Sequence, residues 1–312
     1  MSLPIKENFS FLSSNGTNTV KGFIIRKPQP PYKAIIQISH GMKEHMGRYE
    51  EYMNFMAEKG YVMVGHDHIG HGQSVNDISE LGFFASKDGH IHVLNDIATT
   101  AGRIKKSFPQ LKLILLGHSM GSFYARVFAG KYTYLADGMI ISGTGGKNPL
   151  TVPGKILINL FIKLKGEKAT SKFITGVIFG SFLKKIDNPK TASDWLTRDE
   201  EAVRRYREDE RCRFHFTLGG YKDLVTIQSL ANTGECYEKT NKEIPYLIVS
   251  GDMDPVCGWG KDMETIISRY KNAGVKDVVL KLYKDGRHEM LHELNKEEVY
   301  ADILSWLEDK LD

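Results

Sequence analysis

A serine flanked by glycines is the residue whose setting points most directly to chemistry. Ser119 lies in the sequence GHSMG, residues 117–121. The mostly apolar residues 111–116 before it predict a buried strand, and the apolar residues after it have the spacing of a helix. A G-x-S-x-G turn between a strand and a helix holds the serine hydroxyl above a sheet in a strained backbone conformation, where its oxygen can act as a nucleophile.

A nucleophilic serine needs a base to take its proton and an acid to orient that base. Loops that follow the carboxyl ends of neighbouring strands meet at one edge of an open α/β sheet. Asp252 and Asp254 follow one late predicted strand, and His288 follows the next. We predict Asp254 as the acid, because it lies further from its strand and can reach the next loop; Asp252 is then a turn residue and the alternative. We predict His288 as the base, and His292 competes with it weakly, because there the chain should approach the last helix.

The oxygen that becomes negatively charged in such a reaction needs two backbone N–H donors. One should be the N–H of Met120, the residue after the nucleophile, and the other should come from the loop after the third strand. The sequence His40-Gly41-Met42 occupies that loop, so Met42 N–H is the predicted second donor. His40 is predicted to be structural and to pack beneath the site.

A group of histidines close in sequence raises the alternative of a metal site. Imidazoles such as those of His66, His68 and His71 can bind zinc. No cysteine or carboxylate cluster elsewhere in the sequence completes a ligand set, so we predict no metal and no cofactor. We interpret the stretch as a tight glycine-bounded loop after a strand, in which Asp67 and Ser74 satisfy backbone groups.

Alternating strand and helix patterns must position these groups. Apolar runs predict eight strands, at residues 9–12, 19–25, 34–38, 61–64, 111–116, 135–142, 246–249 and 278–283. The first two should form a hairpin, and the alternation of strands with helices favours an α/β fold with a mainly parallel sheet and helices on both faces. The alternation stops at residue 143 and resumes with a helix at residues 227–231. This pattern predicts a helical insertion, residues 143–226, on top of a core formed by residues 1–142 and 227–312.

The overall composition excludes several classes of protein. The chain has 312 residues, 41% of them hydrophobic, and a net charge of +4 that is too small and too scattered to indicate nucleic-acid binding. Its 3 cysteines are far apart and offer no disulfide framework, which favours a reducing compartment. The sequence shows neither a signal peptide nor an apolar run of about 18 residues, so a cytoplasmic protein is expected.

Five stretches together resemble one known family, the monoacylglycerol lipase and lysophospholipase branch of the α/β-hydrolase superfamily, also called the serine aminopeptidase S33 or hydrolase-4 type. The order Ser, Asp, His along the chain is also that of the α/β-hydrolase triad. The similar stretches are HGMKEHMGRYEEY at residues 40–52, DHIGHGQS at 67–74, GHSMG at 117–121, GDMDPVC at 251–257 and GRHEMLHE at 286–293.

This resemblance implies an α/β-hydrolase fold and the cleavage of carboxylic esters through an acyl-enzyme, without metal or cofactor. It matches the acid to Asp254 and the base to His288. It also matches Cys257 to a position where eukaryotic monoacylglycerol lipases carry a cysteine. The Cys257 thiol would then border the pocket and react with thiol reagents, or it is simply a small buried apolar residue.

In this family the insertion is a cap that forms the acyl pocket, and Phe161, Ile178 and Phe179 are the expected substrate contacts here. The apolar faces of the insertion, surrounded by lysines, either pack on the sheet or are partly exposed and make transient contact with a membrane or micelle surface. Residues 194–214 are highly charged and are predicted to form a solvated helical face, not a binding patch.

The hypothesis that follows is a serine hydrolase for a small single-chain lipid ester, either a monoacylglycerol or a lysophospholipid. The alternatives are a short-chain carboxylesterase or thioesterase, a proline-type aminopeptidase, and a non-catalytic hydrolase-like binding protein. An aminopeptidase would need an acidic clamp for a substrate amine, which the sequence does not identify. The combination of Ser119, Asp254 and His288 argues against a pure binding protein.

Overall fold

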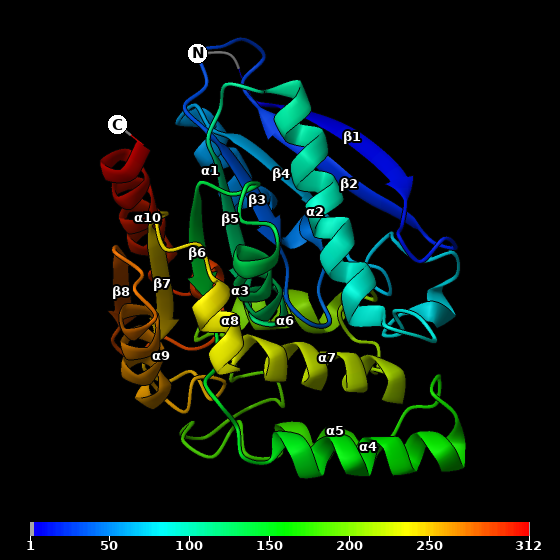
Figure 1. Ribbon diagram of the computed structural model, residues 1–312. Coiled ribbons are helices and arrows are strands. Elements are labelled where there is room, and N and C mark those ends of the chain that lie inside the picture. Colours follow the sequence, from blue (N-terminus) through cyan, green and yellow to red (C-terminus); the bar gives the residue numbers. More distant parts are fainter. Residues whose placement is uncertain (1–2, 312) are drawn as a thin grey trace.

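One eight-stranded sheet forms the centre of the computed structural model, which describes residues 3–311 (Figure 1). The strand order is β1-β2-β4-β3-β5-β6-β7-β8. The pairs β1–β2 and β2–β4 are antiparallel, and all the other pairs are parallel, which confirms the predicted mainly parallel sheet. The strands are β1 (Ile5–Leu12), β2 (Thr19–Arg26), β3 (Ile35–Ser39), β4 (Val62–His66), β5 (Leu113–His118), β6 (Gly138–Ser142), β7 (Tyr246–Gly251) and β8 (Val278–Tyr283).

The central strands lie between two layers of helices, which explains their continuous apolar runs. Every residue of β3, β4, β5, β6 and β7 is buried. β1 lies at the edge and is mostly exposed or half-buried, so its apolar pattern predicts a strand only from residue 9. Pairing with β2 over its whole length extends this strand back to Ile5.

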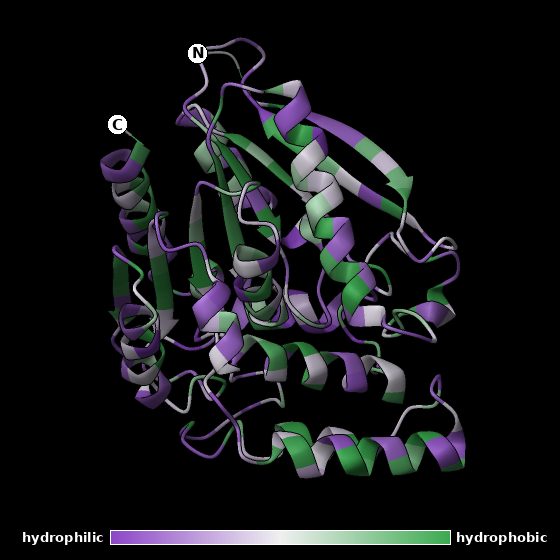
Figure 2. Ribbon diagram, viewed as in Figure 1, coloured by the Kyte–Doolittle hydropathy of each residue, from purple (hydrophilic) through white to green (hydrophobic). Residues whose placement is uncertain are grey.

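Helices cover both faces of the sheet. On one face α1 (Glu50–Glu58) and α10 (Lys296–Leu311) bury aromatic and methionine side chains against the strands. On the other face α2 (Gly89–Ser107), α3 (Met120–Lys131), α8 (Gly234–Lys239) and α9 (Lys261–Asn272) contribute to a second apolar cluster. Figure 2 shows hydrophobic residues concentrated in the central strands and again in α4 and α5, at the end of the molecule away from both termini.

The connection between β6 and β7 carries the helices that lie beyond the carboxyl ends of the parallel strands (Figure 1). They are α4 (Thr151–Lys165), α5 (Lys172–Phe179), α6 (Glu200–Glu208) and α7 (Leu218–Ala231). α7 contacts both α4 and α3, so it joins the outer helices to the helix that follows Ser119. The apolar pattern predicts a helix from residue 227, whereas α7 begins at Leu218; the predicted boundary at residue 226 therefore falls inside one helix.

Short 3₁₀ helices shape the loops next to the site. η1 (Met46–Tyr49) follows the β3 loop, η2 (Ile78–Glu80) lies before α2, and η3 (Met290–His292) follows β8. Within the described part of the chain, no helix is both long and apolar enough to cross a membrane.

Candidate active site

Ser119 occupies a sharp turn between β5 and α3. Its backbone has φ 53° and ψ −117°, a left-handed conformation that a residue with a Cβ adopts only under strain. Glycines on both sides permit the turn: a Cβ on Gly121 would lie 1.9 Å from the carbonyl oxygen of Ser39, and one on Gly117 would lie 2.4 Å from that of Gly121. The sequence therefore folds here into the strained turn that the G-x-S-x-G pattern predicts.

Asp254 and His288 form a buried pair across two neighbouring loops. Asp254 follows β7, His288 follows β8, and the imidazole Nδ1 lies 2.9 Å from Asp254 Oδ2. The second carboxylate oxygen of Asp254 accepts a hydrogen bond from the N–H of Val256 at 2.8 Å. Burial acts to lower the pKa of His288, but the Asp254 carboxylate, together with those of Glu289 and Glu44, holds this pKa above its ordinary value. The pair is thus built to stabilise an imidazolium ion.

The competing residues have other partners. Asp252 is half-buried, and its Oδ1 has no hydrogen-bond partner among the described residues. The Nε2 of His292 lies 3.0 Å from the carbonyl oxygen of Arg48, so His292 ties the β8 loop to η1. The structure therefore brings Asp254, and not Asp252, to His288.

Ser119 and His288 both lie next to the end of β6, at residues 142–143. The N–H of Ser119 donates to the carbonyl oxygen of Ser142 at 2.9 Å, and a Cβ on the following Gly143 would lie 3.0 Å from Cε1 of His288. Both residues line the same cavity. The Nε2 of His288 is buried and has no hydrogen-bond partner among residues 3–311. This nitrogen is the one left to take a proton from a serine hydroxyl, because Nδ1 is occupied by Asp254.

The predicted oxyanion donors lie at the same cavity. Met120 is the first residue of α3, where a helical N–H has no acceptor within its own helix, and Met42 lies in the loop after β3. The carboxylate of Glu44 fixes this loop: it accepts the N–H of Gly41 and, at 2.8 Å, the hydroxyl of Tyr49. The backbone around Met42 is therefore held in place before any substrate arrives.

The cavity has a volume of about 220 Å³ and two chemically different parts. Its apolar part is lined from α4, α5 and α7, and its polar part includes the carboxylates of Glu44 and Glu289 and the phenol of Tyr206. No lysine or arginine is among the described residues that line it. The apolar lining residues that come from α4, α5, α7 and the turn after α5 are Leu157, Ile158, Ile174, Val177, Ile178, Phe179, Phe182, Leu224 and Val225.

Two of the three predicted substrate contacts lie in this cavity. Ile178 and Phe179 line it, whereas Phe161 does not. Phe161 instead stacks on Phe173 of α5, with ring centroids 5.8 Å apart and an interplanar angle of 8°. Spacing along α4 predicts which residues share a face, but which part of that face meets the cavity depends on how α4 rotates against α5.

The charged stretch of residues 194–214 was wrongly predicted to be only a solvated face. Trp195, Leu196 and Tyr206 from this stretch line the cavity, and Cys212 is buried. The high charge of α6 masked these few apolar residues, because six of the nine residues of α6 are Arg or Glu. The one usable sign was the presence of Trp and Tyr in an otherwise charged stretch.

The histidine-rich loop forms a buried cluster with His40, at the end of β3. The rings of His40 and His68 have centroids 4.1 Å apart, those of His66 and His68 5.2 Å, and those of His40 and His71 5.2 Å. Burial lowers the pKa of His40, His66 and His71 to about 3. His40 is fully buried, and its Nε2 accepts the N–H of His68 at 2.9 Å.

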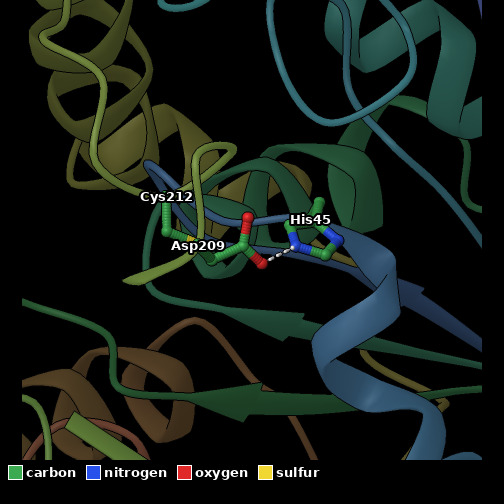
Figure 3. Close-up of side chains that lie close together, drawn as sticks. All are labelled: His45, Asp209 and Cys212. Atoms are coloured by element: carbon green, nitrogen blue, oxygen red, sulfur yellow. Dashed lines mark hydrogen bonds and ion pairs between the residues drawn. The ribbon is translucent and has the colours of Figure 1, made fainter. Parts of the chain in front are cut away.

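Within residues 3–311, one group of three side chains brings possible metal ligands together: His45, Asp209 and Cys212, with ligand atoms within 4.8 Å of one another (Figure 3). The Nδ1 of His45 accepts the N–H of Gly47 at 3.1 Å, so its proton lies on Nε2, which faces Asp209 Oδ2 at 2.8 Å. A metal on Nε2 would move that proton to Nδ1, against the Gly47 N–H. Burial also raises the pKa of Cys212 above its ordinary value, which opposes thiolate formation. These residues fit a hydrogen bond from His45 to Asp209, between the start of η1 and the end of α6, better than a metal site.

Cys257 is buried below the site and does not line the cavity. Its Sγ lies 3.3 Å from the carbonyl oxygen of Asp254 and accepts the N–H of Gly260 at 3.2 Å. Burial raises the pKa of this thiol to about 12, so it is protonated at neutral pH. Its contacts are those of a packing residue in the loop that carries Asp254.

A mostly parallel eight-stranded sheet with a serine at its strand-to-helix elbow defines an α/β hydrolase. The chain belongs to the family described as Serine aminopeptidase, S33, whose model matches residues 30–295. This assignment confirms the resemblance that the sequence motifs indicated.

Characterised relatives narrow the class of reaction. Human monoglyceride lipase is 28% identical over 286 residues, which are 90% of this chain and 84% of that protein. The monoacylglycerol lipase of Mycolicibacterium smegmatis is 24% identical over 97% of both chains. A thermostable carboxyl esterase from Bacillus coagulans, solved in complex with glycerol, superimposes with a TM-score of 0.92 at 28% identity, covering 98% of this chain and 99% of its own. The protein is therefore a carboxylic ester hydrolase.

Proposed function

We propose that this protein cleaves the ester bond of single-chain lipids, in particular monoacylglycerols, through an acyl-enzyme on Ser119. The observation that carries this proposal is the Asp254–His288 pair, which lies at an apolar cavity shared with Ser119. In this proposal the segment between β6 and β7, from residue 143 to residue 226, acts as a cap over the site.

His288 begins the reaction as the base. Its Nε2 takes the proton of Ser119 Oγ while that oxygen attacks the ester carbonyl carbon, and the π electrons of the carbonyl move to its oxygen. The N–H groups of Met42 and Met120 stabilise this negative oxygen, and Asp254 stabilises the imidazolium. The tetrahedral intermediate then collapses, the ester C–O bond breaks, and the leaving alcohol takes the proton from Nε2. A water molecule then gives a proton to Nε2 and attacks the acyl-enzyme carbonyl in the same way. The bond to Ser119 Oγ breaks, this oxygen takes the proton back, and the fatty acid is released.

The lining of the cavity supports a neutral lipid with one acyl chain. The apolar walls from α4, α5 and α7 suit a hydrocarbon chain, since each buried CH₂ contributes about 0.8 kcal/mol. The polar part has two carboxylates, Glu44 and Glu289, which are both ion-paired with Arg48 behind the wall, and no cation is among the described lining residues. No lining cation is therefore free to bind a phosphate, and an uncharged glycerol group suits this part better. The names of the relatives, monoglyceride lipase and monoacylglycerol lipase, support the same substrate class.

A substrate panel tests this proposal. We expect kcat/KM for 1-monooleoylglycerol to exceed that for monobutyrin by about 10-fold or more, because the longer chain buries more CH₂ groups. We also expect lysophosphatidylcholine to be hydrolysed more slowly than monooleoylglycerol. Fatty-acid release under identical conditions measures all three. A preference for the short ester would favour a short-chain carboxylesterase, and hydrolysis of aminoacyl substrates alone would favour an aminopeptidase.

We further propose that the cap touches the lipid surface from which the substrate comes. Ile156, Leu160 and Leu164 on α4 are 66%, 51% and 73% exposed, and Phe173 and Val177 on α5 are 59% and 54% exposed. Such exposed apolar side chains, flanked by lysines that can approach anionic headgroups, are typical of a segment that lies on a membrane. The exposed lysines are Lys163, Lys165, Lys168 and Lys172.

Charges placed on this face should impair only the hydrolysis of aggregated substrate. For the double variant Ile156→Asp/Leu160→Asp we expect about a 10-fold lower rate on monooleoylglycerol in vesicles, because the charges oppose burial in the lipid surface. The rate on a monomeric short ester should stay unchanged, since neither residue lines the cavity. Tyr134→Asp is the matched control, because Tyr134 is 77% exposed outside the cap. An unchanged ratio between the two substrates in the double variant would remove the surface contact from the proposal.

A further inference from the structure

The loop that carries His288 is bound to a segment of the cap. Residues 194–198 run alongside residues 287–293, and backbone groups of the two segments pair directly. The N–H of Glu289 donates to the carbonyl oxygen of Leu196 at 2.7 Å, and the N–H of His288 donates to that of Trp195 at 3.4 Å. Main-chain hydrogen bonds thus join the His288 loop to this segment of the cap.

Side chains add to this pairing from both segments. Arg287 Nη1 donates to the carbonyl oxygens of Asp194 and, at 3.1 Å, Thr197. The hydroxyl of Thr197 donates to the carbonyl oxygen of His292 at 2.9 Å. The backbone N–H and Nε of Arg198 donate to the buried carboxylate of Glu293 at 3.0 and 2.9 Å. Residues 194–198 can therefore leave the core only if the His288 loop loses all of these hydrogen bonds.

The indole ring of Trp195 lies against the imidazole at the centre of this segment. The ring centroids of Trp195 and His288 are 4.9 Å apart with an interplanar angle of 39°. The ring of His118 also contacts His288, at 4.8 Å. Phe182 packs against Trp195, with centroids 4.8 Å apart, and so supports the indole from the side of the cap.

We propose that Trp195 is a positioning residue for His288: it holds the imidazole in place for Ser119 and stabilises the imidazolium formed during the reaction. An aromatic face next to a cation attracts it through the ring quadrupole. This inference rests on the proposed role of His288 as the base. It also restricts cap opening to α4 and α5, because residues 194–198 must stay in place for catalysis.

The electrostatic surroundings of His288 make the effect of Trp195 measurable. The charged and titratable groups that act on its imidazole are Asp254 from the β7 loop, Glu44 from the β3 loop, Glu289 from its own loop and His118 from the end of β5. Substitution of the uncharged Trp195 leaves all four in place. A shift in the titration of His288 would then report the loss of the indole.

The test is the pH dependence of kcat/KM on p-nitrophenyl butyrate for Trp195→Leu and Trp195→Phe. Trp195→Leu keeps an apolar cover over the imidazole but loses the aromatic face. We therefore expect the acidic limb of the kcat/KM profile, which reports the titration of His288, to move about half a pH unit lower. We expect kcat at pH 8 to fall about 10-fold, because the imidazole is less well positioned. Trp195→Phe should restore the wild-type limb.

Two further variants separate positioning from pocket shape. Leu224→Ala changes the cavity wall from α7 and leaves the ring contacts among Phe182, Trp195 and His288 in place, so it should alter KM and leave the acidic limb unmoved. Thr197→Val is isosteric and removes one hydrogen bond between the two segments, so it should lower kcat. It tests the same inference without any change to Trp195, in case Trp195→Leu folds poorly. A Trp195→Leu enzyme whose loss lies wholly in KM, with the limb unmoved, would refute the inference. Activity in His288→Gln would instead refute the proposed function.

Discussion

Replacement of Ser119 by alanine should lower kcat/KM for every ester substrate by about 10⁴-fold or more. No other hydroxyl can take its place in this geometry, because its oxygen stands on the strained elbow whose φ of 53° directs it away from the sheet. Alanine keeps the same Cβ, so the fold and the cavity should be unchanged. Initial rates of monooleoylglycerol and p-nitrophenyl butyrate hydrolysis, with a thermal melt of each protein, measure the effect.

A fluorophosphonate probe gives an independent readout of the same prediction. It should label the wild-type protein once, at Ser119, and leave Ser119→Ala unlabelled. Ser229→Ala is the matched control, since Ser229 is an exposed serine on α7 that does not line the cavity. Hydrolysis by Ser119→Ala at the wild-type rate would show that the nucleophile is elsewhere, and unlabelled wild-type protein would favour a non-catalytic binding protein.

The sequence was most informative where local pattern and strand order act together. Ser119 could be identified from a strand, a glycine-bounded turn and a helix within about twenty residues. The pairing of Asp254 with His288 followed from a physical rule, because both residues come after strands whose carboxyl ends meet at one edge of the sheet. Their separate loops bring Nδ1 and Oδ2 to 2.9 Å, as that rule leads one to expect.

The cap was far less predictable, because its contacts depend on helix rotation and on irregular chain. Phe161 and Phe179 have similar apolar surroundings in the sequence, but only Phe179 meets the cavity. Trp195 lies in a segment without regular structure, where no periodicity indicates which way a side chain points. Its contact with His288 depends on backbone pairing between residues far apart in the chain, and this pairing has no local pattern.

The histidine cluster shows a different reason for uncertainty. Three histidines in one short loop suggested either a metal site or a tight loop, and sequence spacing alone does not separate these. In the structure the nitrogens of His66 and His68 face hydroxyls of Thr100 and Ser39, at 2.9 and 3.0 Å, from other elements. The rings therefore pack as neutral groups in the interior.

Mild acid should unfold this protein steeply, between about pH 5 and pH 4. Burial lowers the pKa of His40, His66 and His71 to about 3 and that of His118 to about 4. In the unfolded chain each would titrate near its ordinary value of 6.5. The folded protein therefore binds fewer protons below that pH, so the stability contributed by these neutral histidines is complete above pH 6.5 and is lost as the pH falls toward 3.

Four such groups make the loss large. At pH 5 to 4, His40, His66 and His71 each contribute about one proton to the difference between the two states, and His118 contributes between about half and one. Together they correspond to about 5 kcal/mol per pH unit. Asp67 and Asp96, whose pKa burial raises, take up protons in the folded state and offset part of this slope. The remaining slope is about 3 to 5 kcal/mol per pH unit. A fall of one or two pH units therefore removes a free energy comparable to the whole stability of a typical domain. Circular dichroism across pH, with urea melts at each pH, measures it.

His66→Gln isolates one member of the cluster. The glutamine amide can still bond to the hydroxyl of Thr100 but cannot be protonated, so the variant should take up about one proton fewer on unfolding and should resist acid better. His215→Gln is the control, because His215 is exposed and its substitution should leave the slope unchanged. Equal proton uptake by His66→Gln and the wild type would mean that His66 has the same protonation in the folded and unfolded states. The acid sensitivity would then have to come from the other buried histidines or from ion-paired carboxylates such as Glu289, whose pKa burial acts to raise but Arg48 holds below its ordinary value.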